Sequence, residues 1–293
     1  MNILILGKGY VGTVIYNQLK PTPHQLMFVS KADHAYDQQD VFERLVRENN
    51  IEVVVNASGY TGRPNVDACE LNRDDTWYYN VVVPGMIGES CRLLNAHLIH
   101  VSSGCIYNGY DKEYTEIDPP DFGICCETSS WYSKTKHAGE LALQGTGASV
   151  LRIRMPFCET TSERNILMKL LKYDNIINQT NSMTNIEDLA EFVEMFLENE
   201  RTWGGIFNVV NPQPISTSVM IDALKQHGVC NSSWKYIELD ELLEKHTTTC
   251  RSNCVLDSTK LEKLNLSLPD THSSLNRCVK MIRDAIPSKY IQP

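Results

Sequence analysis

The chain has 293 residues, of which 42% are hydrophobic and 22% charged, and this composition is that of an ordinary globular protein. Its formal net charge of −9, without a cluster of Lys and Arg, argues against a nucleic-acid-binding protein. Its apolar runs are all shorter than the about 18 residues that a membrane-spanning helix needs, so we expect no membrane partner.

The cysteines and the N-terminal residues bear on the compartment. Met1 leads almost at once into an apolar run, without the basic region or cleavage site of a signal peptide. We therefore expect a cytoplasmic protein, whose 10 cysteines remain thiols under reducing conditions. Their spacings match neither a disulfide framework nor a paired zinc motif, so we predict no metal site.

The first predicted elements point to a dinucleotide. Residues 2–6 form an apolar run typical of a buried parallel strand, and residues 11–20 have a helical pattern. Between them, a glycine-rich turn would let the backbone approach a pyrophosphate at the N-terminus of the helix. In this context the motif predicts cofactor contacts at all six positions, although a tight turn without a ligand is the alternative. These positions are Gly7, Lys8, Gly9, Tyr10, Val11 and Gly12.

The second predicted strand, residues 25–30, ends where the adenosine ribose of a dinucleotide would lie. Ser30 and Lys31 at this end favour the 2′-phosphate of NADPH, whereas Asp33 keeps NADH as an alternative. A solvated loop lysine is the structural alternative for Lys31.

Alternating strands and helices continue to residue 156. We predict strands at 51–57, 98–102 and 150–154, with helices at 41–49, 74–95 and 127–142. This pattern indicates an α/β fold with a Rossmann-type, doubly wound parallel sheet. Ligands of such sheets bind outside the carboxyl ends of the strands. We therefore assign Ala57, Ser58 and Gly59 to the cofactor, and Arg63 and Asn65 on the following loop to the substrate.

The composition changes near residue 156. It predicts an NAD(P)-binding domain at 1–156 and a smaller substrate-binding lobe at 157–293, with some segments returning to the first domain. In the lobe we expect helices at 165–172 and 216–227, and a helix capped by Ser182-Met183-Thr184-Asn185 that runs to about 198. Strands are expected at 175–178 and 205–210, and short elements complete the chain. Arg152, Arg154 and Arg164 are candidates for a nucleotide-sugar diphosphate, with surface ion pairs as the alternative.

The residues most suggestive of chemistry lie between His100 and Lys136. Ser103 ends a predicted strand, and Tyr132 and Lys136 open a predicted helix. Helix positions four apart share a face, and an ammonium beside a phenol lowers the phenol pKa. The three residues thus predict acid–base catalysis at a carbonyl. The Tyr-x-x-x-Lys spacing is common by chance, so the glycine turn and Ser103 give it its weight.

Several segments carry a family resemblance. The order of glycine turn, Ser103 and Tyr132/Lys136 resembles the extended short-chain dehydrogenase/reductases, and within them the dTDP-4-dehydrorhamnose reductases. A closer resemblance is to the plant-type bifunctional UDP-4-keto-6-deoxyglucose 3,5-epimerase/4-reductase of UDP-L-rhamnose synthesis, of which a large virus carries a stand-alone form. The glycine turn is one residue shorter than is usual in that family. The matching segments are 62–67, 104–106, 132–136, 151–156, 181–184 and 251–253.

This resemblance implies NADPH-dependent epimerisation at C3 and C5 of a UDP-sugar, followed by reduction of its C4 ketone. The ketone acidifies the hydrogens at both carbons, so epimerisation should come first. Cys105 is implied as one acid/base and substrate contact, and Lys169 as the other; a packed thiol and a solvated lysine are the alternatives. Arg164 and Asn165 are assigned to the substrate, and a homodimer is expected. A reductase without epimerase activity and a non-catalytic NADP-binding subunit are the competing functions.

Overall fold

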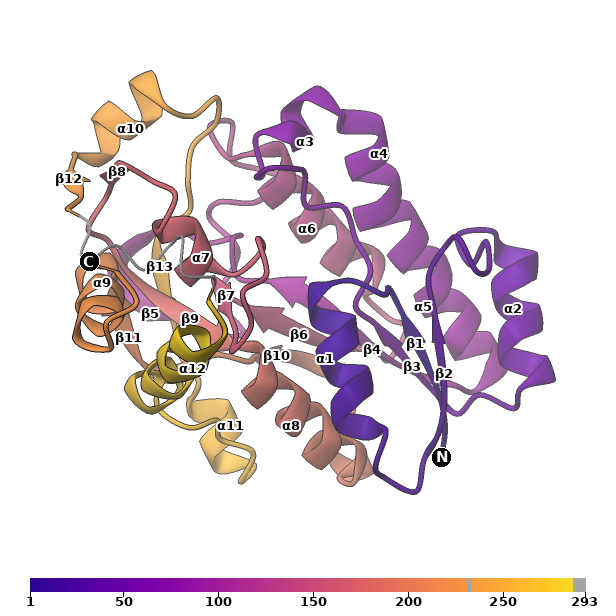
Figure 1. The fold of residues 1–293 in the computed structure, drawn as a ribbon. Coiled ribbons are helices and arrows are strands. Elements are labelled where there is room, and N and C mark those ends of the chain that lie inside the picture. Colours follow the sequence, from indigo (N-terminus) through magenta and orange to yellow (C-terminus); the bar gives the residue numbers. More distant parts are fainter. Residues whose placement is uncertain (231–232, 287–293) are drawn as a thin grey trace.

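The computed structural model describes residues 1–230 and 233–286, and a parallel sheet of six strands forms its centre (Figure 1). The strands lie in the order β2-β1-β3-β4-β6-β10, and each neighbouring pair is parallel. Their bounds are β1 Asn2–Leu6, β2 Gln25–Val29, β3 Val53–Asn56, β4 His97–Ser103, β6 Ser149–Ile153 and β10 Gly205–Asn208. The doubly wound α/β fold predicted from the sequence is confirmed.

Helices cover both faces of this sheet. On one face α1 (Tyr10–Leu19) and α8 (Ile186–Leu197) pack together over the strands. On the other face lie α2 (Gln39–Glu48), α5 (Val83–Leu94) and α6 (Trp131–Ala142). A strand covered on both sides must be apolar throughout, which explains the unbroken apolar run of β1.

The predicted helix at 74–95 is interrupted. The chain forms α3 (Ala68–Leu71) and α4 (Arg73–Trp77), then a π-helical turn at Tyr78–Val82, and only then α5. Asn80 in this turn is buried and holds the loop after β3, because its side chain accepts from the Tyr60 N–H and donates to the Tyr60 carbonyl.

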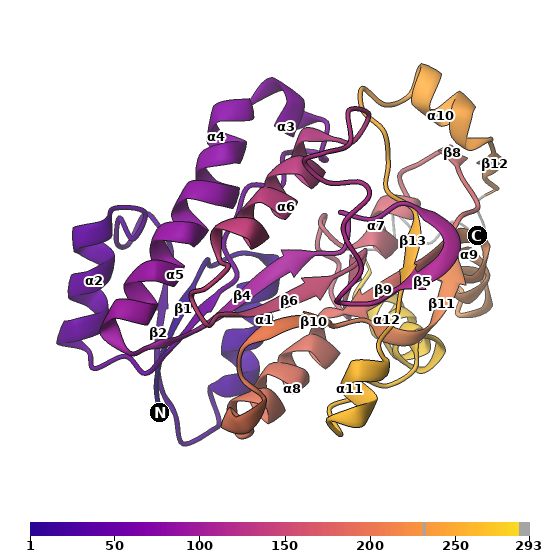
Figure 2. The ribbon, with the colours of Figure 1, turned by 180° about the vertical axis from the view of Figure 1, so that it is seen from behind.

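A second lobe lies at the carboxyl ends of the central strands (Figure 2). Its three-stranded sheet consists of β7 (Pro156–Phe157), β9 (Thr180–Asn185) and β11 (Asn211–Ser216). Three helices pack with this sheet around a separate apolar core: α7 (Ile166–Leu170), α9 (Thr217–Gln226) and α12 (Thr271–Ala285). The remaining elements are the strand pairs β5 (Gly109–Tyr114) with β13 (Cys254–Leu256) and β8 (Asn175–Ile176) with β12 (Lys235–Tyr236), the helices α10 (Leu239–Lys245) and α11 (Thr259–Lys263), and a 3₁₀ turn at Glu200–Thr202.

Three segments differ from the sequence-based expectations. Residues 182–184 lie in β9 rather than in a helix cap, and only Asn185 caps α8, by accepting from the Asp188 N–H. The stretch between the run 100–107 and the helix of Tyr132, rich in Asp, Pro and Cys, has the composition of a loop, yet it contains β5, which is stabilised by pairing with the distant β13. Helix α12 occupies a segment for which only short elements are expected from the sequence. Its buried residues Leu275, Val279 and Ile282 recur at helical spacing, and such spacing predicts a helix.

The two parts of the chain do not divide at one residue. β10 pairs with β6 in the central sheet, and α8 packs on α1, so residues from beyond 157 complete the first domain. Among the described helices, none combines the length and the apolar character needed to cross a membrane.

Candidate active site

Ser103, Cys105 and Tyr132 come together where β4 ends and α6 begins. Ser103 is the last residue of β4, and its hydroxyl accepts a hydrogen bond from the Cys105 N–H at 3.2 Å. Ser130 caps α6 by accepting from the Ser133 N–H at 3.1 Å, which starts the helix just before Tyr132. The Ser103 hydroxyl is close enough to the Tyr132 hydroxyl to lower its pKa. A carbonyl oxygen placed at this pair could accept from both.

The structure does not show the predicted lowering of the Tyr132 pKa by the Lys136 ammonium. The Lys136 ammonium is buried and donates to the Val101 carbonyl at 3.3 Å. Desolvation is the largest influence on Tyr132 and raises its pKa, while the Ser103 hydroxyl lowers it. The expectation that the lysine makes the phenol a stronger acid is thus corrected, because withdrawal of the hydroxyl from water outweighs it. A phenol with a raised pKa stays protonated at neutral pH and can serve as a proton donor.

Cys105 has a cation beside it. The Nη1 of Arg154, directly after β6, lies 3.0 Å from the Cys105 sulfur. The sequence makes Arg154 a candidate for a substrate diphosphate, but the residue is 1% exposed and its guanidinium donates to Asn181 and to the Ser252 carbonyl. It therefore belongs to the wall of the reaction centre rather than to a solvent-facing anion site.

The glycine turn has the shape that a dinucleotide needs. A Cβ on Gly12 would lie 2.1 Å from the Gly7 carbonyl oxygen, and one on Gly7 would lie 3.0 Å from Cα of Ser58, so both positions require glycine. Gly7 also has a φ of +99°, which strongly favours glycine. A Cβ on Gly9 would meet nothing within 4 Å, which leaves open space at the N-terminus of α1. This cradle fits a pyrophosphate.

Other residues assigned to the cofactor surround this turn. Ala57, Ser58 and Gly59 follow β3 at the point where the strand order reverses, next to Gly7. The side chains of Tyr10 and Val11 are partly buried and pack on the core beneath α1.

Two lysines lie near the end of β2, Lys31 from the loop that follows it and Lys8 from the glycine turn after β1. Lys8 lies 2.8 Å from the Asp33 carboxylate, which also accepts from the Ser30 N–H and hydroxyl. Lys31 lies over the Tyr79 ring, at 4.3 Å from its centroid, and 3.8 Å from Asp37. Because Asp33 is already engaged by Lys8 and Ser30, the polar surface here is closer to what a 2′-phosphate needs than to what a ribose diol needs.

Two substitutions distinguish a glycine that the fold requires from a glycine that the dinucleotide requires. We expect Gly12→Ala to destabilise the protein by about 1–3 kcal/mol, because its Cβ would collide with the Gly7 carbonyl. Gly9→Ala should cost at most about 1 kcal/mol, the usual loss at an N-cap, yet weaken dinucleotide binding by occupying the cradle. Thermal unfolding and a fluorescence titration with NADPH would measure both effects. Unchanged NADPH affinity in Gly9→Ala would contradict the assignment.

Arg164, which is assigned to the substrate, contacts the loop that follows β3. Arg164 donates to the Thr61 hydroxyl at 2.8 Å and to the Gly62 carbonyl at 3.0 Å. Lys169 on α7 is half-buried, and its pKa is lowered by desolvation and by the nearby Arg164. No hydrogen bond or ion pair of its ammonium is found with the described residues. Within these residues no contact joins Lys169 to Cys105, so its pairing with the thiol stays a prediction.

The loop that carries Arg63 and Asn65 is fastened to the second lobe. The Asn65 side chain accepts from the Asp67 N–H, and Asp67 forms a two-point ion pair with Arg251 at 2.7 and 2.8 Å. Arg63 is exposed. The Asp67–Arg251 bridge was not foreseen from the sequence, although both residues lie in segments that carry the family resemblance.

Two other predicted ligands are engaged within the protein. The buried Asn165 caps α7 by accepting from the Leu167 N–H and donates both amide hydrogens to the Cys158 and Thr160 carbonyls. Arg152 is 2% exposed and forms a two-point pair with Glu140. Asn165 thus positions the start of α7 next to Arg164, and Arg152 stabilises the core behind the reaction centre.

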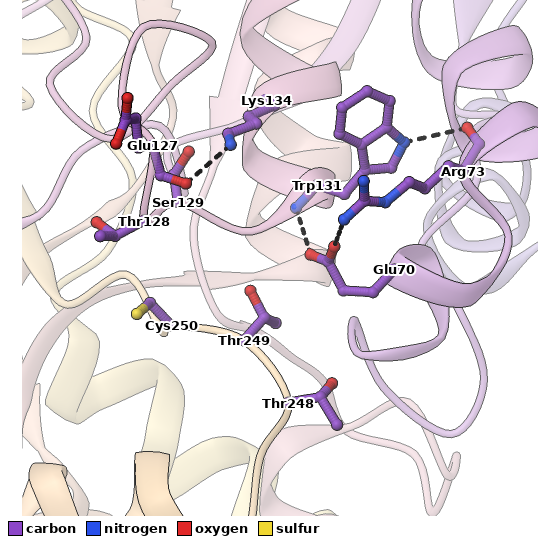
Figure 3. Close-up of a pocket in the computed structure, with 10 residues that line it drawn as sticks. All are labelled: Glu70, Arg73, Glu127, Thr128, Ser129, Trp131, Lys134, Thr248, Thr249 and Cys250. Carbon is purple, nitrogen blue, oxygen red and sulfur yellow. Dashed lines mark hydrogen bonds and ion pairs between the residues drawn. The ribbon is translucent and has the colours of Figure 1, made fainter.

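A cavity of about 330 Å³ lies next to the start of α6 (Figure 3). Trp131, Arg73 and Glu70 form one side of it, and the loop 248–250 of the second lobe faces them. The Trp131 N–H donates to Glu70 at 2.6 Å. None of Ser103, Cys105, Tyr132 and Lys136 lines this cavity. It therefore lies between the start of α6 and the loop 248–250, apart from the reaction centre.

The buried Lys136 gives a pH test. Burial lowers its pKa to about 8, whereas an unfolded lysine titrates near pH 10.4. Between these values the unfolded chain binds more protons, so the stability of the protein should rise with pH. We expect Lys136→Met to be more stable than the parent at pH 7, by up to about 3 kcal/mol, and to lose about 2 kcal/mol of this advantage by pH 9.5. Urea denaturation at both pH values, with Lys134→Met as control, would test it; a constant advantage would contradict the burial argument.

Comparison with known proteins places this geometry in a family. The family model described as the RmlD substrate binding domain matches residues 1–283. The chain belongs to the RmlD family. It is 34% identical over 220 residues to the bifunctional dTDP-4-dehydrorhamnose 3,5-epimerase/dTDP-4-dehydrorhamnose reductase of Arabidopsis thaliana, which covers 71% of this chain and 70% of that protein. It is 33% identical to the trifunctional UDP-glucose 4,6-dehydratase/UDP-4-keto-6-deoxy-D-glucose 3,5-epimerase/UDP-4-keto-L-rhamnose-reductase RHM3, matching 72% of this chain but only 32% of that protein.

A solved structure agrees with the RmlD assignment. The L780 UDP-rhamnose synthase of Acanthamoeba polyphaga mimivirus superposes with a TM-score of 0.84 at 26% identity, over 96% of this chain and 99% of that one. The resemblance to a stand-alone viral form is thus confirmed, and an identity of 26% makes this chain a relative of L780 rather than the same protein. These relatives are oxidoreductases of rhamnose synthesis, and the family resemblance predicted from the sequence is confirmed.

Proposed function

We propose that the chain converts UDP-4-keto-6-deoxyglucose to UDP-L-rhamnose by 3,5-epimerisation followed by NADPH-dependent reduction of the C4 ketone. The observation that supports this is the joining of Ser103, Tyr132 and Cys105 at one point beside the end of β4. Two hydroxyl donors suit a ketone reductase, and the thiol adds the group that a reductase alone does not need.

Epimerisation would proceed at the carbons next to the ketone. A base takes the C5 or C3 proton, and the electron pair of the C–H bond moves into the carbonyl to give an enolate. Ser103 and Tyr132 would stabilise the enolate oxygen by hydrogen bonds. Return of a proton to the opposite face re-forms the ketone with inverted configuration. Cys105 and Lys169 are the proposed pair of acid/base groups, on opposite sides of the sugar.

Reduction would use the same oxygen. The glycine turn, Gly7 to Gly12, would hold NADPH, which when bound would supply the hydride for C4. As the C–O bond becomes single, Tyr132 donates its proton to the developing alkoxide, and the raised pKa of the phenol means that it carries that proton at neutral pH. Lys136 anchors the start of this helix to β4 through Val101. Lys8 and Lys31 support NADPH over NADH.

The remaining substrate contacts are proposals of the same kind. Arg63 in the loop 61–65 and Arg164, which contacts that loop, would face the diphosphate, and Asn65 would order the loop. Substrate binding would occur between the dinucleotide-binding domain and the second lobe, which Asp67 and Arg251 join. We place the protein in the cytoplasm, where its free cysteines would stay reduced. The homodimer stays a prediction, which light scattering of the purified chain would test.

One assay separates the candidate functions. The purified chain is given UDP-4-keto-6-deoxyglucose and NADPH in D₂O, and both nicotinamide oxidation and deuterium at C3 and C5 are followed. UDP-L-rhamnose with deuterium at both carbons is the expected product. Reduction without deuterium would leave a reductase only, and no turnover of either kind would leave a non-catalytic subunit. A parallel run with the dTDP-sugar compares the two nucleotides.

A further inference from the structure

The Arg154 guanidinium is buried without a carboxylate. It is 1% exposed, and its Nη2 donates to the Asn181 side-chain oxygen at 2.5 Å and to the Ser252 carbonyl at 2.6 Å. Both acceptors are neutral. Among the described residues no acidic side chain forms an ion pair with Arg154, and its Nε has no partner. A buried charge that is left uncompensated is costly, so a negative group is expected nearby.

The arginine two positions earlier shows the usual solution. Arg152 lies on β6 and is just as buried, but its Nη2 lies 2.7 Å from the Glu140 carboxylate. The two side chains differ in what compensates them. Sulfur atoms lie beside the Arg154 guanidinium, whereas a carboxylate lies beside that of Arg152.

Two thiols flank Arg154, and they are not equivalent. Cys254 is fully buried, its S–H donates toward the Gly104 carbonyl at 3.8 Å, and burial raises its pKa, so it is a neutral thiol. Cys105 is only partly buried, and its sulfur accepts from Nη1 of Arg154 at 3.0 Å. Cys105 is therefore the group whose negative charge would complete the pair.

We propose that Arg154 is the positioning residue that holds the Cys105 sulfur as a thiolate, poised for proton transfer in the epimerisation proposed above, on which this role rests. The other groups facing Cys105 are Tyr132 and Lys136 on α6 and Cys254 on β13. The first and last are neutral there, and the Lys136 ammonium is held by Val101. The direct cation at the sulfur is thus Arg154.

The placement also explains why distant segments meet here. Arg154 is held by residues 49, 27 and 98 positions away in the chain, namely Cys105, Asn181 and Ser252. Its own N–H donates to the Thr184 hydroxyl at 3.0 Å. Four of the segments that carry the family resemblance therefore converge on this one guanidinium.

The test measures the thiol itself. Iodoacetamide alkylation of Cys105 is followed by peptide mass spectrometry between pH 5 and 9.5, so that the reactive thiols elsewhere do not interfere. In Arg154→Met we expect the midpoint of the Cys105 profile to rise by about one pH unit or more, with roughly tenfold slower alkylation at pH 7. Arg154→Lys should restore part of the rate, since it keeps the charge but loses the planar fork. Arg164→Gln, which removes a cation that does not touch the sulfur, should leave the profile unchanged.

Loss of NADPH binding would reveal that Arg154→Met does not fold. In that case a second variant tests the proposal. Asn181→Asp places a carboxylate on the same guanidinium while retaining Arg154, and it should raise the midpoint in the same direction. A folded Arg154→Met or Asn181→Asp protein with the parent profile would overturn the proposal.

The outcome is separable from that of the proposed function. If alkylation depends on Arg154 but deuterium exchange persists in a Cys105→Ala variant, the thiolate pair stands and its role in epimerisation falls. If exchange depends on Cys105 but alkylation ignores Arg154, the epimerase function stands and this inference falls.

Discussion

Replacement of Cys105 by alanine is expected to abolish exchange of the C3 and C5 hydrogens with solvent while sparing reduction of a substrate that is already epimerised. The thiol lies beside the Ser103–Tyr132 pair without forming part of it, and its removal leaves both hydroxyl donors in place. Loss of one acid/base group typically slows proton transfer by about 10²–10⁴-fold. Deuterium incorporation measured by NMR, next to NADPH oxidation with UDP-4-keto-L-rhamnose, gives both rates.

The control for this experiment is another accessible thiol. Hydrogen bonds, first from Thr128, lower the pKa of Cys126, which makes it a reactive cysteine outside the reaction centre. Cys126→Ala should exchange and reduce like the parent protein. Persistent exchange in Cys105→Ala would remove the thiol from the mechanism and leave Cys105 as a packed residue at the end of a strand.

Replacement of Tyr132 by phenylalanine is expected to impair both reactions. The ring and its packing remain, but the ketone oxygen loses a donor that would stabilise both an enolate and an alkoxide. Loss of one such donor costs about 10²–10³ in rate, and the lost proton donor adds to this in the reduction step. We therefore expect reduction to fall more than exchange. Stopped-flow measurement of NADPH oxidation and deuterium exchange on the same preparation would show the difference.

A surface tyrosine supplies the matched control. Tyr236 is 51% exposed and lies on β12, outside the reaction centre, so Tyr236→Phe should be neutral. Together the two variants of the site give a pattern: Cys105→Ala loses exchange only, whereas Tyr132→Phe loses both. If Tyr132→Phe kept the parent rate of reduction, another group would have to deliver the proton, and the assignment of Tyr132 would be wrong.

Much of the fold could be read from local patterns. The apolar run of β1, the glycine turn and the helical spacing of α1 are contiguous, so the sequence predicts them together. The same holds for Ser103 at a strand end and for Tyr132 at a helix start. Each of these features depends on neighbours only a few residues away. Helix α12 is also of this kind, although the polar residues of the segment mask its helical spacing.

Other features depend on where distant segments meet. β5 is a strand because β13 lies beside it, more than a hundred residues later in the chain. The arginines had been grouped as diphosphate candidates, and they proved to have three environments. Arg152 pairs with Glu140, Arg154 with a thiol, and Arg164 with the loop after β3. A sequence shows that a residue is an arginine, but it does not show whether a carboxylate will face it.

The amino-acid sequence alone thus determined the doubly wound sheet, the glycine turn and the polar residues at the ends of β4 and α6, because strand and helix periodicity and turn chemistry act over short distances. Only the tertiary structure decided that Lys136 is directed to Val101, that burial rather than a neighbouring ammonium governs Tyr132, and that Cys105 faces Arg154. These properties arise from desolvation and from charges brought together across the chain, and both exist only once the protein has folded.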